Sequence, residues 1–249
     1  MPKLNSPDME MNTLTGHYGF SATKIEHLGA TEYTLVDIVV DSSGSVSDFQ
    51  TELEDCVKEV INSCKMSPRA DNLMIRLVEF NQAVTEIHGY KLLENCNLDD
   101  YNSVLRLYGS TALFDAAENS VLAQTAYAKD LVDNDFSVNS IVVVITDGAD
   151  NVSHGCANDV KKALAAAVKE EAVESMVSIL IGVNPHKNTH LTDYLSSFKF
   201  DAGFTQYEEI DKADAKTLAK LAKFISRSIS AQSSSLGTGG PSQPQSFTI

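Results

Sequence analysis

The segment YTLVDIVVDSSGS, at residues 33–45, decides the fold class of this chain. Its first part is almost continuously apolar and rich in β-branched residues, which is typical of a strand that other elements cover on both faces. Asp41 ends this strand, and a run of serines and a glycine follows it. Because such residues favour turns, the segment predicts a buried strand that opens into a loop at one edge of a sheet.

The rest of the chain alternates between strand and helix signals, which predicts a mainly parallel sheet with helices on both faces. Apolar runs predict strands at residues 73–80, 140–146 and 176–183, and a weaker signal predicts a short strand at 204–207. Helical spacing of apolar residues predicts helices near residues 47–65, 113–122, 158–174, 189–198 and 213–230. Ser47 and Gln50 have the spacing of a capping box for the first of these helices.

A short turn at Asn81 and Gln82 connects the strand at 73–80 to a second apolar segment at 84–88. A connection of this length joins antiparallel strands, so we expect residues 84–88 at the edge of the sheet.

Composition divides the chain into three parts. Residues 1–31 are expected to form an N-terminal extension that packs partly on the domain through Tyr18, Phe20 and Ile25. Residues 32–231 carry the α/β pattern. Residues 232–249 are rich in Ser, Gly, Pro and Gln with few apolar side chains, which predicts a flexible tail.

The charge and hydropathy of the chain exclude several classes of function. The formal net charge of −15 disfavours binding to nucleic acid, because attraction to phosphates supplies most of that affinity. No apolar run approaches the roughly 20 residues that a membrane-spanning helix needs. The first residues lack the basic and then apolar order of a secretory signal, so we expect a cytoplasmic protein, or a virion protein if a phage encodes it.

The four cysteines do not have the spacing of a zinc site. Cys56, Cys64, Cys96 and Cys156 form no CxxC pair, and no His lies at a matching distance in the sequence. Reduced cysteines on an apolar helix face behave as small hydrophobic residues, so we expect the cysteines to be buried thiols.

Two apolar strands end in an aspartate, Asp41 and Asp147. In open α/β sheets, ligands bind outside the carboxyl ends of strands at the point where the strand order reverses. If both strands flank that point, the two carboxylates repel each other unless a cation lies between them. Ser43, Ser45 and, from a separate loop, Thr111 add hydroxyl oxygens, which together with carboxylates suit a hard divalent ion.

Three segments resemble the von Willebrand factor A domain: DSSGS at 41–45, GSTALFDA at 109–116 and ITDG at 145–148. In that family the matching segments form the metal-ion-dependent adhesion site, and the resemblance extends over residues 33–230. It implies a Rossmann-like three-layer sandwich with a mainly parallel six-strand sheet and one antiparallel edge strand. Cytosolic bacterial or phage members are the most similar in character, since a signal peptide and disulfides are lacking.

The resemblance also implies the role of each site residue. Ser43 and Ser45 would bind the metal directly, and Thr111 would bind it directly or through water, depending on whether the domain is open or closed. Asp41 and Asp147 would often act through water. The expected ion is Mg²⁺, with Mn²⁺ or Ca²⁺ as alternatives, and an Asp or Glu carboxylate of a protein partner would complete its coordination.

Two other functions compete with this non-enzymatic binding module. One is a structural or assembly component of a phage particle or bacterial complex, in which the metal site would serve self-assembly. The other is a Mg²⁺-dependent phosphotransferase or phosphatase. A haloacid-dehalogenase-like enzyme would need a second aspartate where Ser43 stands, and the chain has neither a GxxxxGK[ST] loop nor a GxSxG elbow.

Overall fold

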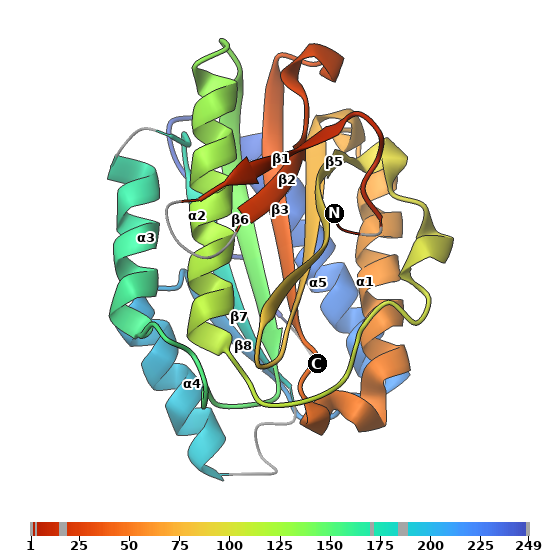
Figure 1. Cartoon of the computed structure of the whole chain (residues 1–249), viewed down its shortest axis with the longest axis vertical. Helices are drawn as coiled ribbons and strands as arrows, with labels where there is room; N and C mark the ends of the chain where they lie inside the picture. The colour runs from red at the N-terminus through yellow and green to blue at the C-terminus, as the bar shows by residue number, and fades with distance from the viewer. Residues whose placement is uncertain (1, 3, 15–18, 170–171, 184–188, 248–249) are drawn as a thin grey trace.

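The computed structural model describes residues 2, 4–14, 19–169, 172–183 and 189–247. One sheet of eight strands runs through these residues in the order β1-β2-β5-β4-β3-β6-β7-β8 (Figure 1). The strands are β1 (Met9–Thr13), β2 (Gly19–Thr23), β3 (Glu32–Asp41), β4 (Leu73–Phe80), β5 (Val84–Leu92), β6 (Ser137–Thr146), β7 (Met176–Val183) and β8 (Gln206–Ile210).

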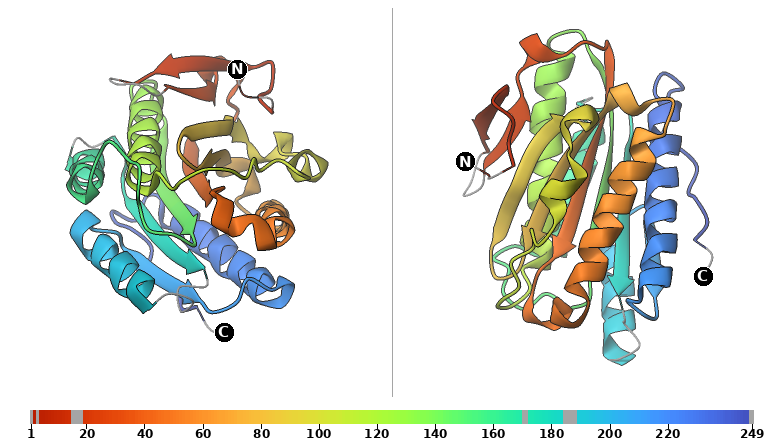
Figure 2. Two further views of the ribbon diagram at one scale, coloured as in Figure 1. Left: turned by 60° about the horizontal axis from the view of Figure 1, so that its bottom comes forward. Right: turned by 90° about the vertical axis from the view of Figure 1, so that its right-hand side faces the viewer.

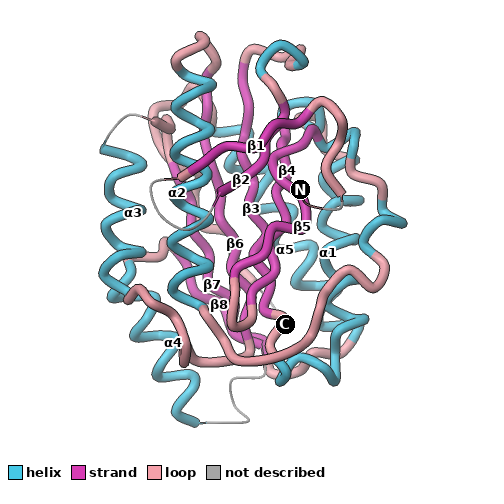
Figure 3. Tube along the Cα trace, in the orientation of Figure 1, coloured by secondary structure: helices cyan, strands magenta, loops and turns pink. Residues whose placement is uncertain are grey.

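Helices cover both faces of the sheet and make it the middle of three layers (Figures 2 and 3). One face carries α1 (Gln50–Lys65) and α5 (Ala215–Ser235), and the other carries α2 (Leu113–Val132), α3 (Ala157–Lys169) and α4 (Thr189–Ala202). The helices divide the core into two apolar clusters, one on each side of the strands. The three-layer α/β fold expected from the sequence is therefore confirmed.

The central strand β3 shows why the apolar run at residues 33–41 forms a doubly covered strand. Val36, Ile38 and Val40 pack in the cluster that contains α1 and α5. Leu35 and Val39 pack in the cluster that contains α2. The two sets alternate because successive side chains on a strand point to opposite faces. β3 pairs in parallel with β4 on one side and β6 on the other, so both of its edges are also satisfied.

The number of strands differs from the six that the family resemblance implies. The six neighbouring strands β5-β4-β3-β6-β7-β8 correspond to the expected sheet. Within them, β4 and β5 are the expected antiparallel pair. A hairpin of β1 and β2 then extends the sheet, because Ala22 pairs with Tyr90 of β5. The sequence suggested that residues 84–88 lie at the edge of the sheet. This prediction is wrong, because β2 lies outside β5. The hairpin strands are short and partly polar, so their apolar pattern is weak.

The start of α1 also differs from the sequence prediction. Ser47 lies in a 3₁₀ segment, Gly44–Phe49, and α1 begins only at Gln50. The side-chain amide Nε2 of Gln50 donates to Glu54 Oε1 and to the backbone oxygen of Leu105, and the N-cap of α1 is Phe49, so Ser47 and Gln50 do not form the predicted capping box.

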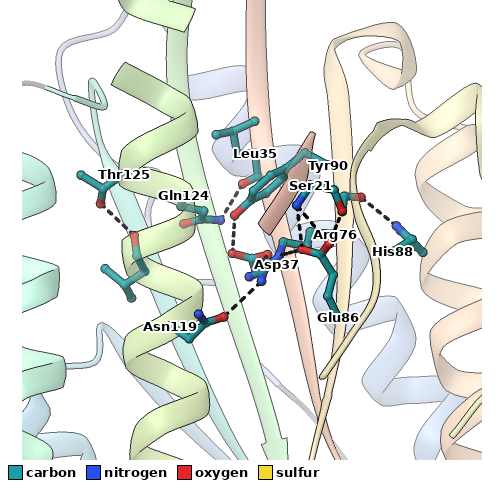
Figure 4. A network of polar contacts seen from close by, with 12 residues as sticks. Ser21, Leu35, Asp37, Arg76, Glu86, His88, Tyr90, Asn119, Gln124 and Thr125 are labelled. Atoms are coloured by element: carbon teal, nitrogen blue, oxygen red, sulfur yellow. Dashed lines mark hydrogen bonds and ion pairs between the residues drawn. The ribbon is translucent and has the colours of Figure 1, made fainter. Parts of the chain in front are cut away.

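A buried polar network joins the N-terminal hairpin to the central strand (Figure 4). Arg76 Nε donates to Glu86 Oε2 at 2.7 Å, and Arg76 Nη1 lies 3.6 Å from Asp37 Oδ1. Tyr90 Oη donates to Asp37 Oδ2 at 2.7 Å, and both the backbone N–H and the hydroxyl of Ser21 bond to Glu86. Burial raises the pKa of Asp37 to about 7, although the charge of Arg76 and the bond from Tyr90 oppose this shift.

The two ends of the chain both contact the domain. Phe20 in β2 is 1% exposed and packs beside the rings of Tyr90 and Tyr127. At the other end α5 continues past residue 231 to Ser235, and the ring of Phe247 lies 5.5 Å from that of Phe224. The division of the chain at residues 31 and 231 stays a prediction.

Three of the four cysteines are buried thiols, and Cys156 is exposed. Burial raises the pKa of both Cys56 and Cys64 to about 12, so these thiols stay protonated at neutral pH. None of the helices in the described ranges combines the length and the hydropathy needed to cross a bilayer.

Gly89 allows the hairpin to approach β5 closely, and this contact can be tested. A Cβ atom at position 89 would lie 1.9 Å from the backbone oxygen of Ser21, so Gly89→Ala must displace the hairpin. We expect a loss of about 1–3 kcal/mol in the free energy of unfolding and faster proteolysis within residues 1–31. Gly29→Ala is the matched control, because nothing lies within 4 Å of a Cβ there. Equal stability of the two variants would contradict the close contact.

Candidate functional site

The candidate site lies where the strand order of the sheet reverses. From β3 the chain passes through α1 to β4 on one side, whereas β6 lies on the other side of β3. Asp41 is the last residue of β3, and Asp147 directly follows the last residue of β6. Because the two strands are parallel, both aspartates lie at the same edge of the sheet, at the lower end in Figure 1.

Hydrogen bonds connect four of the five predicted site residues, and we call these four linked residues the oxygen chain. Asp41 Oδ1 accepts from the backbone N–H of Ser43 at 2.8 Å, which folds the loop back over the strand end. Ser43 Oγ lies 3.0 Å from Ser45 Oγ, and Ser45 Oγ donates to Asp147 Oδ1 at 2.6 Å. Two loops that are about a hundred residues apart in sequence thus meet through a hydroxyl and a carboxylate.

Thr111, the fifth residue, reaches the same place from the loop before α2. A Cβ atom on Gly148 would lie 3.2 Å from Thr111 Oγ1 and 3.9 Å from Asp41 Oδ2. The Thr111 hydroxyl and the Asp41 carboxylate therefore both face the backbone of Gly148, and a side chain there would enter the space between them. Asn151 fixes the loop, since its Oδ1 accepts from Thr111 N at 2.9 Å and its N donates to Thr111 O at 3.0 Å.

The electrostatics of the site favour a cation. Asp41 is 1% exposed, and burial raises the pKa of its carboxyl to about 6. Bonds from Ser43 and Thr146 lower that pKa, and the nearby charge of Asp147 raises it further. No group of three His, Cys, Asp or Glu side chains that could hold a metal occurs in the described part of the chain. The five site residues instead offer three hydroxyls and two carboxylates.

The oxygen spacing fits a small octahedral ion. Ligands about 2.1 Å from Mg²⁺ lie about 3.0 Å from one another along an octahedral edge, and Ser43 Oγ and Ser45 Oγ are 3.0 Å apart. Both oxygens of Asp41 already accept hydrogen bonds, from Ser43 N and Thr146 Oγ1. The two serine hydroxyls are therefore suited to direct contact with an ion, and Asp41 is suited to contact through water.

Several residues that orient the site were not identified as site residues from the sequence. Thr146 Oγ1 donates to Asp41 Oδ2 at 2.6 Å. Asp150 Oδ2 accepts from the backbone N of Phe114 in the first turn of α2, and Asp115 accepts from the backbone N of Gly155. Strand register could have identified Thr146, because Val40 of β3 pairs with Ile145 and the next residues on each strand are Asp41 and Thr146.

The model of the von Willebrand factor type A domain family matches residues 36–222, which is well over half of the chain. No curated protein was found to match.

Solved structures with a similar fold include proteins from animals and bacteria. Proximal thread matrix protein 1 from the mussel byssus is 18% identical with a TM-score of 0.56, over 80% of this chain and 47% of the mussel chain. The chain therefore spans about half the length of that protein. Another structure of the mussel protein, with a TM-score of 0.52 and 16% identity, has a zinc-occupied MIDAS motif.

Two bacterial pilus proteins are also similar in fold. The PilB minor pilin from Streptococcus sanguinis, in its D319A mutant, is 14% identical with a TM-score of 0.54, over 88% of this chain and 66% of the pilin. The pilus adhesin SpaC from Lactobacillus rhamnosus GG is 12% identical with a TM-score of 0.55, over 90% of this chain and 34% of the adhesin. Together with the family match and the three-layer sheet, these likenesses lead to one conclusion: the chain belongs to the von Willebrand factor type A domain family.

Proposed function

We propose that this chain is a metal-dependent protein–protein interaction module that binds an acidic side chain of its partner through a divalent cation. The observation that carries the proposal is the convergence of five oxygen-bearing side chains from three loops. Four of them are linked by hydrogen bonds, and the fifth, Thr111, lies beside the same glycine as Asp41.

The donor set explains why such an ion would bind a partner. Ser43, Ser45 and Thr111 offer neutral hydroxyls, and Asp41 and Asp147 supply the only two carboxylates of the set. When bound, the ion would supply a Lewis-acidic position that a partner's Asp or Glu carboxylate can occupy. Mg²⁺ is the proposed ion, because it prefers oxygen ligands in octahedral geometry and keeps exchangeable waters in protein sites.

The family membership supports an interaction role, and the pilus adhesin and the byssus matrix protein show that this fold occurs in adhesive and structural proteins. Asp41 is already engaged by Ser43 and Thr146, which suits an orienting role better than nucleophilic attack. We therefore propose a non-enzymatic module.

The proposal is tested by asking whether a carboxylate enters the coordination sphere of the bound ion. The chain is loaded with Mn²⁺, whose inner-sphere waters enhance the relaxation of bulk water protons, and sodium acetate is added. We expect the enhancement to fall as acetate replaces a bound water. Acetamide, which has the same shape without the charge, should have little effect.

A relaxation enhancement that stays constant up to hundreds of millimolar acetate would contradict the proposed docking chemistry, even if Mn²⁺ itself binds. Turnover of phosphate esters that depends on Mg²⁺ and is lost in Asp41→Ala would contradict the non-enzymatic assignment.

A further inference from the structure

A pocket lies at the end of the molecule opposite to the candidate metal site. It is formed where the last turn of α1 meets the second half of α5, two helices that lie side by side in Figure 2. Its volume is about 610 Å³. α1 begins beside the serine loop of the metal site and extends for 16 residues, which at 1.5 Å per residue is about 24 Å. The pocket is therefore separate from the metal site.

The lining of this pocket is unusual for so acidic a chain. Five serines line it together with Arg69, Arg227, Gln245, Met66 and Pro68, and no Asp, Glu or aromatic residue is among the described residues that line it. The chain as a whole has 34 Asp and Glu against 19 Lys and Arg. Ser63 and Ser226 already donate their hydroxyl protons to Glu59 and to the backbone oxygen of Lys223, so the two guanidinium groups and the other three hydroxyls are the groups that can donate hydrogen bonds to an anion.

Neighbouring protein groups hold the side chain of Arg69 in place. Arg69 Nε donates to Ser233 Oγ at 3.2 Å, and Arg69 Nη1 pairs with Glu32 at 2.7 Å. Arg69 Nη2 is buried and has no hydrogen-bond partner among the described residues. A buried donor without an acceptor is destabilising, so an acceptor oxygen that came within reach of Nη2 would be stabilising.

Of the two arginines in the pocket, Arg227 has the charge that protein groups compensate less. It is exposed on α5, and its Nη2 donates to the backbone oxygen of Ser246 at 3.1 Å. No Asp or Glu forms a salt bridge with it among the described residues, whereas Glu32 compensates part of the charge of Arg69. Since a guanidinium carries five N–H donors in a planar fork, Arg227 can bind a phosphate oxygen and keep its bond to the C-terminal segment.

We propose that this pocket binds the phosphate monoester of a small polyol, such as a sugar phosphate. The two guanidinium groups would bind the phosphate, and the serine hydroxyls and the Gln245 amide would bind the polyol hydroxyls. The absence of an aromatic ring from the lining disfavours a nucleobase, because bases are usually held by stacking. The volume lies within the range of small-molecule sites and exceeds what a phosphate ion alone would fill.

The test uses the full chain with glucose 6-phosphate, glucose and inorganic phosphate as probes, and calorimetry and amide chemical shifts as readouts. We expect glucose 6-phosphate to bind more tightly than inorganic phosphate, glucose not to bind, and EDTA to leave binding unchanged. Shifts should concentrate on residues 63–69 and 226–234. Arg227→Gln should weaken binding about tenfold or more, as expected for loss of a charged hydrogen bond.

Lys223→Gln is the matched control, because it removes one positive charge from an exposed position of the same helix that does not line the pocket. Equal weakening by both variants would reduce the effect to general electrostatics and overturn the site. Equal affinity for inorganic phosphate and glucose 6-phosphate would overturn the polyol part of the proposal. No binding of either anion by a folded chain would overturn all of it.

Discussion

Replacing both serines of the loop, in Ser43→Ala/Ser45→Ala, is expected to weaken Mg²⁺ and Mn²⁺ binding by at least about 100-fold, because even outer-sphere partners of a metal contribute 10–100-fold to affinity. Both hydroxyls lie in the oxygen chain between Asp41 and Asp147, and the spacing of Ser43 Oγ and Ser45 Oγ matches an octahedral edge. The fold should change little, since neither hydroxyl contributes to the apolar core. Mn²⁺ titration and circular dichroism measure the two effects separately.

Ser47→Ala is the matched control for this double variant. Ser47 belongs to the same 3₁₀ segment, Gly44–Phe49, and is exposed, but it is not in the oxygen chain. Its metal affinity should equal that of the unchanged chain. If the double variant bound Mn²⁺ as tightly as the control, the serine hydroxyls would not be ligands, and the assignment of the site would be wrong.

The second large effect concerns stability. Arg76→Ala is expected to lower the free energy of unfolding by about 3–5 kcal/mol, the usual cost of leaving a buried charge without its partner. Arg76 is 1% exposed and faces two carboxylates, those of Asp37 and Glu86 (Figure 4). Removing it would leave both acids buried beside each other, and Ser21 of the hairpin would bond to a carboxylate that has lost its counter-ion.

Urea denaturation of the variant provides the measurement. Lys223→Ala serves as the control, because that lysine is exposed and surface substitutions usually change stability by no more than about 0.5 kcal/mol. Restoring neutrality in Arg76→Met/Asp37→Asn/Glu86→Gln should recover much of the lost stability. A loss below about 1 kcal/mol for Arg76→Ala would show that the network is not a charge-compensated unit.

The sequence predicted the parts of the fold whose residues are buried on both faces. The strands Leu73–Phe80 and Met176–Val183 begin and end where the apolar runs at residues 73–80 and 176–183 do. The signal is clear because a doubly covered strand needs apolar residues at successive positions. Even so, Arg76 is buried inside the first of these runs, and only the structure shows the two carboxylates that compensate its charge.

The hairpin was not predicted because it depends on contacts with distant residues. The segments at Met9–Thr13 and Gly19–Thr23 are short, and Ser21 and Thr23 are polar although both are buried. Their burial depends on Glu86 and Tyr90, which lie more than sixty residues away. Local propensity carries no information about such a pairing, so the N-terminal segment showed only scattered apolar residues.

The site could be predicted to a larger extent, because its residues come from loops that follow recognisable strands. Strand ends predicted that Asp41 and Asp147 would lie close together, and the family resemblance implied that Ser43, Ser45 and Thr111 would join them. The orienting contacts could not be predicted in the same way. Whether Asp150 caps a distant helix or Asn151 holds Thr111 depends on loop conformation rather than on residue type.

The central claim is that one divalent ion binds among these five side chains, and a crystal soaked in MnCl₂ tests it most directly. We predict a single strong anomalous peak about 2.1 Å from Ser43 Oγ and Ser45 Oγ, the metal–oxygen distance of such sites. Thr111 Oγ1 should lie within direct reach or one water of the peak, and Asp41 and Asp147 should approach it mainly through waters. A peak elsewhere, or none at this edge of the sheet in a manganese-soaked crystal, would contradict the account.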